Sequence, residues 1–192
     1  LVEVPDGPMS WCPTMAVNGS HLFFSPKFTL GLSEPEIVGV VAHEITHCAF
    51  QHMTRRGQRD PEIWNIAGDF VINSDLKKAG FTLPGSPITM KSPPGTKGYL
   101  YDPQYDGMST EEVYERIFKQ CQKMKAAGGA GKSGKGQQGQ GQNGQGNAPN
   151  GQGPLIDHGG CGGVIDASAS HDKAQADTVA REWEANVRMA IN

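Results

Sequence analysis

Two histidines and a glutamate stand at a spacing that suits metal-assisted hydrolysis. His43, Glu44 and His47 form an HExxH sequence inside an apolar segment of helical periodicity. Positions four apart lie on one face of a helix, so both imidazoles can bind a single ion. Glu44 can then activate a metal-bound water as general base, which is the arrangement of zinc-dependent peptide hydrolases. The alternative is a surface helix with scattered histidines.

A second helix is expected to supply a third ligand. Residues 61 to about 79 are apolar over most of the helix circumference, yet Asn65, Asp69 and Asn73 form a polar stripe at i, i+4 and i+8. Because a buried carboxylate should be paired or bound to metal, we choose Asp69 as the third zinc ligand. Asn73 could orient one of the two histidines. The alternative for Asp69 is to accept hydrogen bonds from backbone N–H groups or an arginine.

His52 is the rival third ligand, five positions after His47. If the helix continues, this offset turns His52 away from the face that carries the HExxH histidines. The longer histidine motif needs a glycine and a third histidine where Phe50 and Met53 stand. We therefore expect His52 at the surface or behind a ligand.

Four further side chains could face the cleft. Tyr101 and Tyr105 lie near the end of a proline- and glycine-rich stretch at 81–107, predicted to be a long loop. A phenol there could donate to an oxyanion, or the tyrosines could simply pack. His158 and Cys161 lie beside glycines that permit close backbone approach. They could provide a transition-state donor or an inhibitory thiolate, or belong to a structural turn.

The HExxH helix has a clear start. Ser33 and Glu36 form a capping box immediately before the apolar periodic run. A basic last turn at 55–56, followed by Gly57, predicts where the segment ends. The helix should therefore have one buried side that carries the histidines.

The other helices are marked in the same way. Asp60 as N-cap and Pro61 at the first helical position predict the start of the second helix, and Gly80 predicts its end. A capping box over 109–112 opens another helix. A last helix is expected from about Asp172.

A hairpin is predicted ahead of the HExxH helix, because Asn18-Gly19 separates apolar runs at 14–17 and 20–24 and favours a type I′ turn. Its edge strand could hold an extended peptide by adding it to the sheet, or could only cover the core. His21, on the second strand, could be a ligand or a structural histidine.

Residues 126–154 consist mostly of glycine and glutamine and contain no acidic or aromatic side chain. Such a segment cannot bury enough apolar area to offset its chain entropy, so we expect a disordered insertion. The length of 192 residues then favours a single domain over 1–192.

The overall composition limits the classes of partner and the compartment that we expect for this protein. A formal charge of -3 gives no sign of a nucleic-acid surface, and no apolar run approaches the length of a membrane span. Four widely spaced cysteines without a CxxC pair favour a reducing cytoplasm over a disulfide scaffold. Because the sequence begins at Leu1 and not at methionine, we expect a fragment or a processed form.

Several stretches together resemble one family, the bacterial and phage metallopeptidases whose HExxH domain precedes a von Willebrand factor A-like domain. The resemblance rests on Ala42-His43-Glu44-Ile45-Thr46-His47, the stretch 64–73, Tyr101-Asp102-Pro103 with Met108-Ser109-Thr110-Glu111-Glu112, and Gly159-Gly160-Cys161-Gly162. It implies a zincin-like α+β fold, with the HExxH helix packed on a second ligand helix and a small antiparallel sheet. The placement of Asp69 and Asn73 is similar to the second ligand helix of thermolysin-like enzymes.

Two functions follow as hypotheses, and hydrolysis of a non-peptide amide with the same ligands is a third possibility. The first is a zinc-dependent metallopeptidase that acts on peptide or protein substrates, with Zn²⁺ bound by His43, His47 and Asp69. The second is a zinc-stabilised binding or adaptor module with little protease activity, working with a von Willebrand-like domain and an ATPase partner. A closed site completed by His158 or Cys161 would favour the second.

Overall fold

The computed structural model describes residues 1–7, 10–93, 95–128 and 173–191. It combines helices with two small sheets, which makes the fold α+β as predicted. The helices are α1 (Pro26–Leu30), α2 (Glu34–Ala49), α3 (His52–Arg55), α4 (Pro61–Lys78), η1 (Pro103–Tyr105), α5 (Thr110–Gly128) and α7 (Lys173–Ile191). The strands are β1 (Val2–Glu3), β2 (Met15–Val17), β3 (Leu22–Phe24), β4 (Ser86–Ile88) and β5 (Gly98–Leu100). In the part of the chain so described, no helix has the length and apolarity needed to cross a membrane.

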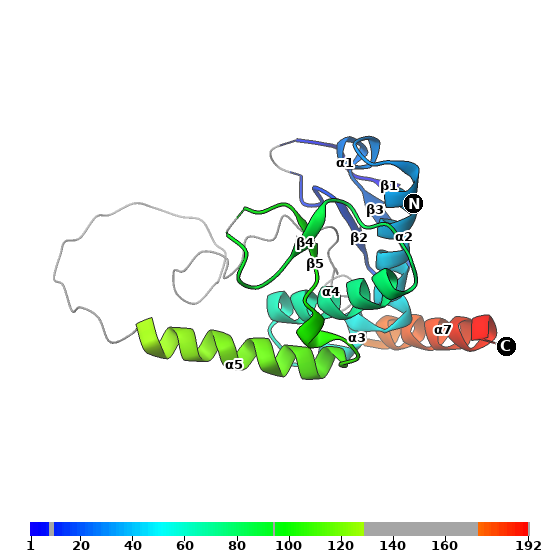
Figure 1. Ribbon diagram of the computed structural model, residues 1–192. Helices are drawn as coiled ribbons and strands as arrows, with labels where there is room; N and C mark the ends of the chain where they lie inside the picture. Colours follow the sequence, from blue (N-terminus) through cyan, green and yellow to red (C-terminus); the bar gives the residue numbers. More distant parts are fainter. Residues whose placement is uncertain (8–9, 94, 129–172, 192) are drawn as a thin grey trace, which may run out of the picture.

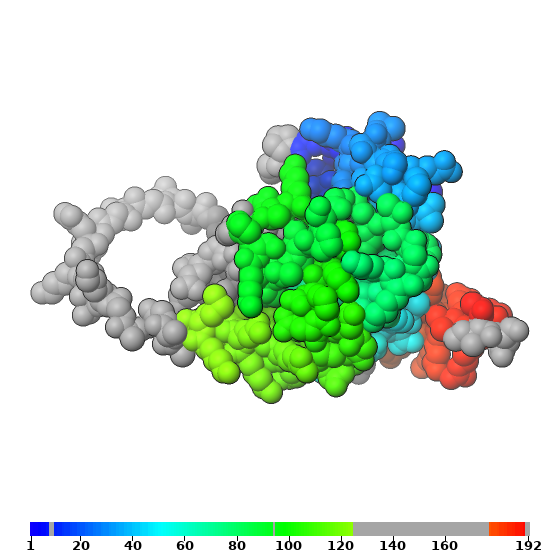
Figure 2. Space-filling model, viewed as in Figure 1, coloured from blue at the N-terminus to red at the C-terminus, as the bar shows by residue number. Residues whose placement is uncertain are grey.

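The elements pack in layers around α4. Strand β2 packs on α2, α2 packs on α4, and α4 packs on both α5 and β5, while α7 lies against α2 and α3 (Figure 1). Figure 2 shows that the segment from α4 to α5 forms most of one face of the molecule, with α7 at its edge. Helix α4 is therefore the central element that the other layers cover.

Helix α4 begins and ends where the sequence predicts. The Asp60 side chain accepts hydrogen bonds from the backbone N–H groups of Glu62 and Ile63, and Pro61 occupies the first turn. Gly80 follows the last turn with a φ of 85°, a conformation that glycine adopts without strain. Its buried apolar side chains form the main core with α5 and the two short strands β4 and β5.

Helix α2 begins at the predicted capping box but ends earlier than predicted. The Glu36 carboxylate accepts hydrogen bonds from both the backbone N–H and the hydroxyl of Ser33. The helix stops at Ala49, because Gln51 adopts a left-handed φ of 56° and the chain restarts as α3. The prediction of a helical segment continuing to Gly57 was therefore wrong.

The first sheet contains the predicted hairpin. Strands β2 and β3 pair antiparallel, but β1 pairs with β3 in parallel, so the sheet is mixed and not purely antiparallel. The turn is not type I′, because that type needs a positive φ at both central residues and only Gly19 has one. Instead, the Asn18 side chain accepts hydrogen bonds from the N–H groups of Ser20 and His21.

The stretch at 81–107 contains more regular structure than a long loop. Strands β4 and β5 pair in parallel within it, and η1 follows them. The capping box at Ser109 and Glu112 opens α5 as predicted, and α7 begins at Lys173, close to its predicted start. Helix α5 extends to Gly128, and residues 129–154 of the predicted insertion lie outside the described residues.

Candidate metal centre

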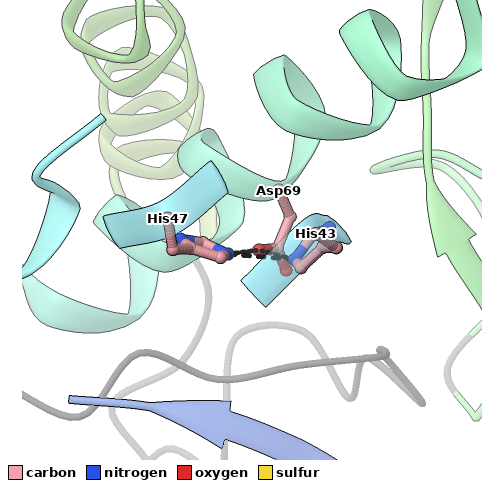
Figure 3. A group of neighbouring side chains, drawn as sticks. All are labelled: His43, His47 and Asp69. Carbon is pink, nitrogen blue, oxygen red and sulfur yellow. Dashed lines mark hydrogen bonds and ion pairs between the residues drawn. The ribbon is translucent and has the colours of Figure 1, made fainter. Parts of the chain in front are cut away.

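Three of the predicted site residues meet at the contact between α2 and α4. His43 and His47 present their Nε2 atoms from α2, and Asp69 presents a carboxylate oxygen from α4 (Figure 3). The two Nε2 atoms are 2.9 Å apart, and Asp69 Oδ1 lies 3.1 Å from that of His47 and 3.4 Å from that of His43. All three residues are buried. The two histidines at i and i+4 on α2 and the aspartate of the polar stripe on α4 therefore meet at one point.

Asn73 fixes the orientation of His43. The Asn73 Nδ2 group donates a hydrogen bond to the Leu100 carbonyl, so its Oδ1 atom must face His43 Nδ1, which lies 2.8 Å away. An amide oxygen only accepts, so His43 Nδ1 carries the proton and donates it. In its neutral form the imidazole then has a bare Nε2 lone pair, which points at Asp69 and His47. This is the protonation that a metal-ligating histidine needs.

When His43 is neutral, acceptor atoms of the cluster face one another with no proton between them. With the proton of His43 on Nδ1, its Nε2 is an acceptor, and it faces both an aspartate oxygen and a second imidazole nitrogen. Ligands at tetrahedral zinc distances would stand about 3.3 Å from one another, and the observed separations of 2.9 to 3.4 Å are close to this value. The donor set and its spacing therefore fit a divalent metal ion.

The charges in the cluster support the same conclusion. Burial alone would raise the pKa of Asp69, but hydrogen bonds from His43 and His47 outweigh it and hold that pKa below its ordinary value. Burial also lowers the pKa of His47, so this imidazole is favoured in its neutral form. For His43, burial lowers the pKa, but the hydrogen bond and the charge of Asp69 outweigh this effect and raise it. A metal ion would replace the proton that His43 and Asp69 otherwise share.

Glu44 lies beside the cluster with its carboxyl group unpaired. The residue is 0% exposed, and neither carboxyl oxygen has a hydrogen-bond partner among the described residues. Burial raises its pKa to about 8, partly opposed by the nearby His43. A buried carboxyl group without a partner is costly to maintain, and such groups are common where a side chain must exchange protons. Its placement is consistent with the predicted general base.

His52 lies behind His47 and is buried, with 1% of its surface exposed. Its Nδ1 atom is 2.9 Å from His47 Nδ1. Of the two predicted places for His52, the surface is wrong, because the left-handed residue Gln51 ends α2 and turns the chain back beneath the cluster. The sequence gives no strong signal for this turn, since neither glycine nor proline stands there.

The two predicted tyrosines make their contacts elsewhere. The Tyr105 ring packs against Phe70 in the core, with ring centroids 4.8 Å apart. The Lys77 ammonium lies 4.3 Å from the centroid of the Tyr101 ring. These contacts match the packing alternative. His158 and Cys161 lie outside the described residues, so their predicted roles remain predictions.

The comparison with known proteins points to one family. Residues 7–192 match a family model described as "Putative metallopeptidase domain". No curated protein and no solved structure matches the chain.

Proposed function

We propose that this chain, which belongs to the family of metallopeptidase domains whose model it matches, hydrolyses peptide bonds with a zinc ion. One structural observation carries the proposal, the convergence of His43, His47 and Asp69 on a single point. The family membership supports the reaction class, and the cluster supports its dependence on a metal. The packing of the HExxH helix α2 on the second ligand helix α4 supports a zincin-like arrangement.

Zinc is the metal that suits this donor set best. Two imidazoles and one carboxylate are a common ligand set of catalytic zinc, which keeps a further coordination position for water or substrate. Magnesium and calcium prefer oxygen ligands, so a site with two imidazole nitrogens disfavours both ions. His43 and His47 would enter as neutral ligands and Asp69 as an anion, which leaves a site with one net positive charge.

The metal ion and the protein side chains would contribute different parts of the reaction. When bound, the zinc ion acts as a Lewis acid on the scissile carbonyl and lowers the pKa of a water to about 7. Glu44 accepts a proton from the water as that water attacks the carbonyl carbon, and then transfers this proton to the leaving amine. Burial raises the pKa of the Glu44 carboxyl in the metal-free protein, and the charge of a bound ion would lower it toward the ionised form that a general base needs. Asn73 keeps His43 in the ligating tautomer.

The experiment compares the purified protein with Glu44→Gln in metal content and in digestion of a proteome-derived peptide library. We expect the wild type to cleave peptides and Glu44→Gln to retain the metal but lose cleavage. Glu115→Gln, an exposed glutamate on α5, is the matched control and should cleave like the wild type. A Glu44→Gln protein that cleaves as fast as the wild type would refute the mechanism.

The same experiment addresses the binding-module alternative. A wild-type protein that holds stoichiometric zinc but cleaves no peptide in the library would overturn the hydrolase proposal and favour a zinc-stabilised adaptor. A von Willebrand-like domain or an ATPase would then be the partner to test.

A further inference from the structure

His52 occupies a position that several independent contacts define. The left-handed conformation of Gln51 turns the chain between α2 and α3, and the Trp64 indole N–H donates to the His52 carbonyl at 2.8 Å. These two features fix the backbone of His52. Its ring then lies between His47 on one side and Thr110, the first residue of α5, on the other.

Gly68 on α4 makes room for this ring. A Cβ atom at this position would lie 2.8 Å from His52 Nδ1 and 3.4 Å from His47 Cε1. Glycine inside a helix costs about 1 kcal/mol relative to alanine, so its presence one residue before Asp69 has a structural reason. A side chain at this position would therefore displace the His52 ring, whose Nδ1 atom lies 2.9 Å from His47 Nδ1.

The proton arrangement follows from the ligand role of His47. If His47 Nε2 binds the metal, its neutral ring carries the proton on Nδ1, and His52 Nδ1 must accept it. The proton of the His52 ring then lies on Nε2, which is 2.9 Å from Thr110 Oγ1 and donates to it. His47, His52 and Thr110 are all buried, so bulk water does not compete for the hydrogen bonds between them.

We propose that His52 is a positioning residue that fixes the tautomer and ring orientation of His47, and that Thr110 fixes His52 in turn. The inference rests on the proposed function only in that His47 ligates the metal. Each histidine ligand then has its own hydrogen-bond acceptor for the Nδ1–H group, an amide for His43 and an imidazole for His47. The arrangement also ties the metal site to α5, which a second contact, the Arg55–Glu111 ion pair at 2.6 Å, holds against α3.

The first experiment compares two substitutions of similar size that differ in one acceptor. In His52→Asn, the new amide oxygen can lie near the position of His52 Nδ1. In His52→Leu, the new side chain offers His47 no acceptor. We measure zinc affinity by competition with a chromophoric chelator. His52→Leu should bind zinc about 10- to 100-fold more weakly, as is typical when the partner of a ligating histidine is removed. His52→Asn should restore most of the affinity. His21→Leu, at an exposed histidine outside the cluster of His43, His47 and Asp69, should leave it unchanged.

The second experiment reads the tautomers directly in the wild-type protein. ¹⁵N-edited NMR of the zinc-loaded protein should show His52 protonated on Nε2 with a bare Nδ1. This measurement needs no substitution, so it stays decisive if a His52 variant fails to fold. A His52 ring protonated on Nδ1 in the zinc-loaded protein would overturn the proposal.

The outcomes separate this inference from the proposed function. If the wild type binds no zinc, both fail. If the wild type binds stoichiometric zinc while His52→Leu and His52→Asn bind it equally tightly, only the positioning role fails. Loss of peptide cleavage with normal zinc affinity and the expected tautomers would refute the hydrolase and leave His52 as proposed.

Discussion

Replacing Glu44 by glutamine should stabilise the metal-free protein, and the gain should grow as the pH rises. Burial raises the pKa of the Glu44 carboxyl from its ordinary value of 4.5 to about 8 in the folded protein. In the unfolded chain the group ionises above about pH 4.5, whereas in the folded protein it stays protonated up to about pH 8. The folded state therefore loses stability relative to the unfolded state as the pH rises through this window. Glutamine has nearly the same shape and does not titrate.

The magnitude follows from the separation of the two pKa values. Each pH unit inside the window corresponds to about 1.4 kcal/mol, so raising the pH from 5 to 7 should cost the wild type about 2–3 kcal/mol that Glu44→Gln does not lose. Comparing the change between two pH values removes any constant cost of placing an amide in the site.

The assay is urea unfolding of the chelator-treated wild type and Glu44→Gln at pH 5 and pH 7. At an m-value of about 2 kcal/mol/M, the midpoint difference between the two proteins should grow by about 1 M between the two pH values. The exposed Glu115→Gln substitution should show no such growth. A midpoint difference that is equal at both pH values would refute the reasoning, because the buried carboxyl would then already be ionised in the folded protein.

Two further substitutions test the supports of the site. Asn73→Leu removes the acceptor of the His43 Nδ1–H group and should weaken zinc binding about 10- to 100-fold in chelator competition, and unchanged affinity would show that His43 needs no partner. Gln51→Val places a β-branched residue at a φ of 56° and should lower the free energy of unfolding by about 1–2 kcal/mol, whereas Gln51→Gly should be tolerated. Equal stabilities of the Val and Gly variants would mean that the left-handed turn does not persist in solution.

The sequence was most informative where local chemistry decides the structure. Ser33 and Asp60 carry the hydrogen-bonding side chains that start α2 and α4, and the structure confirms both. The periodic spacing that placed His43 and His47 on one face, and Asp69 on the polar stripe of α4, also depends only on helix geometry. These features could therefore be predicted without knowledge of the tertiary structure.

The sequence was least informative where distant residues decide the structure. The turn at Gln51 depends on long-range contacts, since the indole of Trp64 and the hydroxyl of Thr110 both bind His52 only after α4 and α5 have packed. The pairing of β4 with β5 likewise depends on backbone hydrogen bonds between short strands rich in proline and glycine. The spacing argument for His52 assumed that the helix continues past residue 50. It therefore could not predict that the chain turns at Gln51 and places the His52 ring against His47.

The central claim is that two helices hold one metal ion through His43, His47 and Asp69. Elemental analysis of zinc after dialysis, for the wild type and Asp69→Ala, tests it most directly. Asp75→Ala, at an exposed aspartate on the same helix, is the matched control. We predict stoichiometric zinc in the wild type and the control, and loss of zinc in Asp69→Ala. Stoichiometric zinc in Asp69→Ala, or none in the wild type, would contradict the claim.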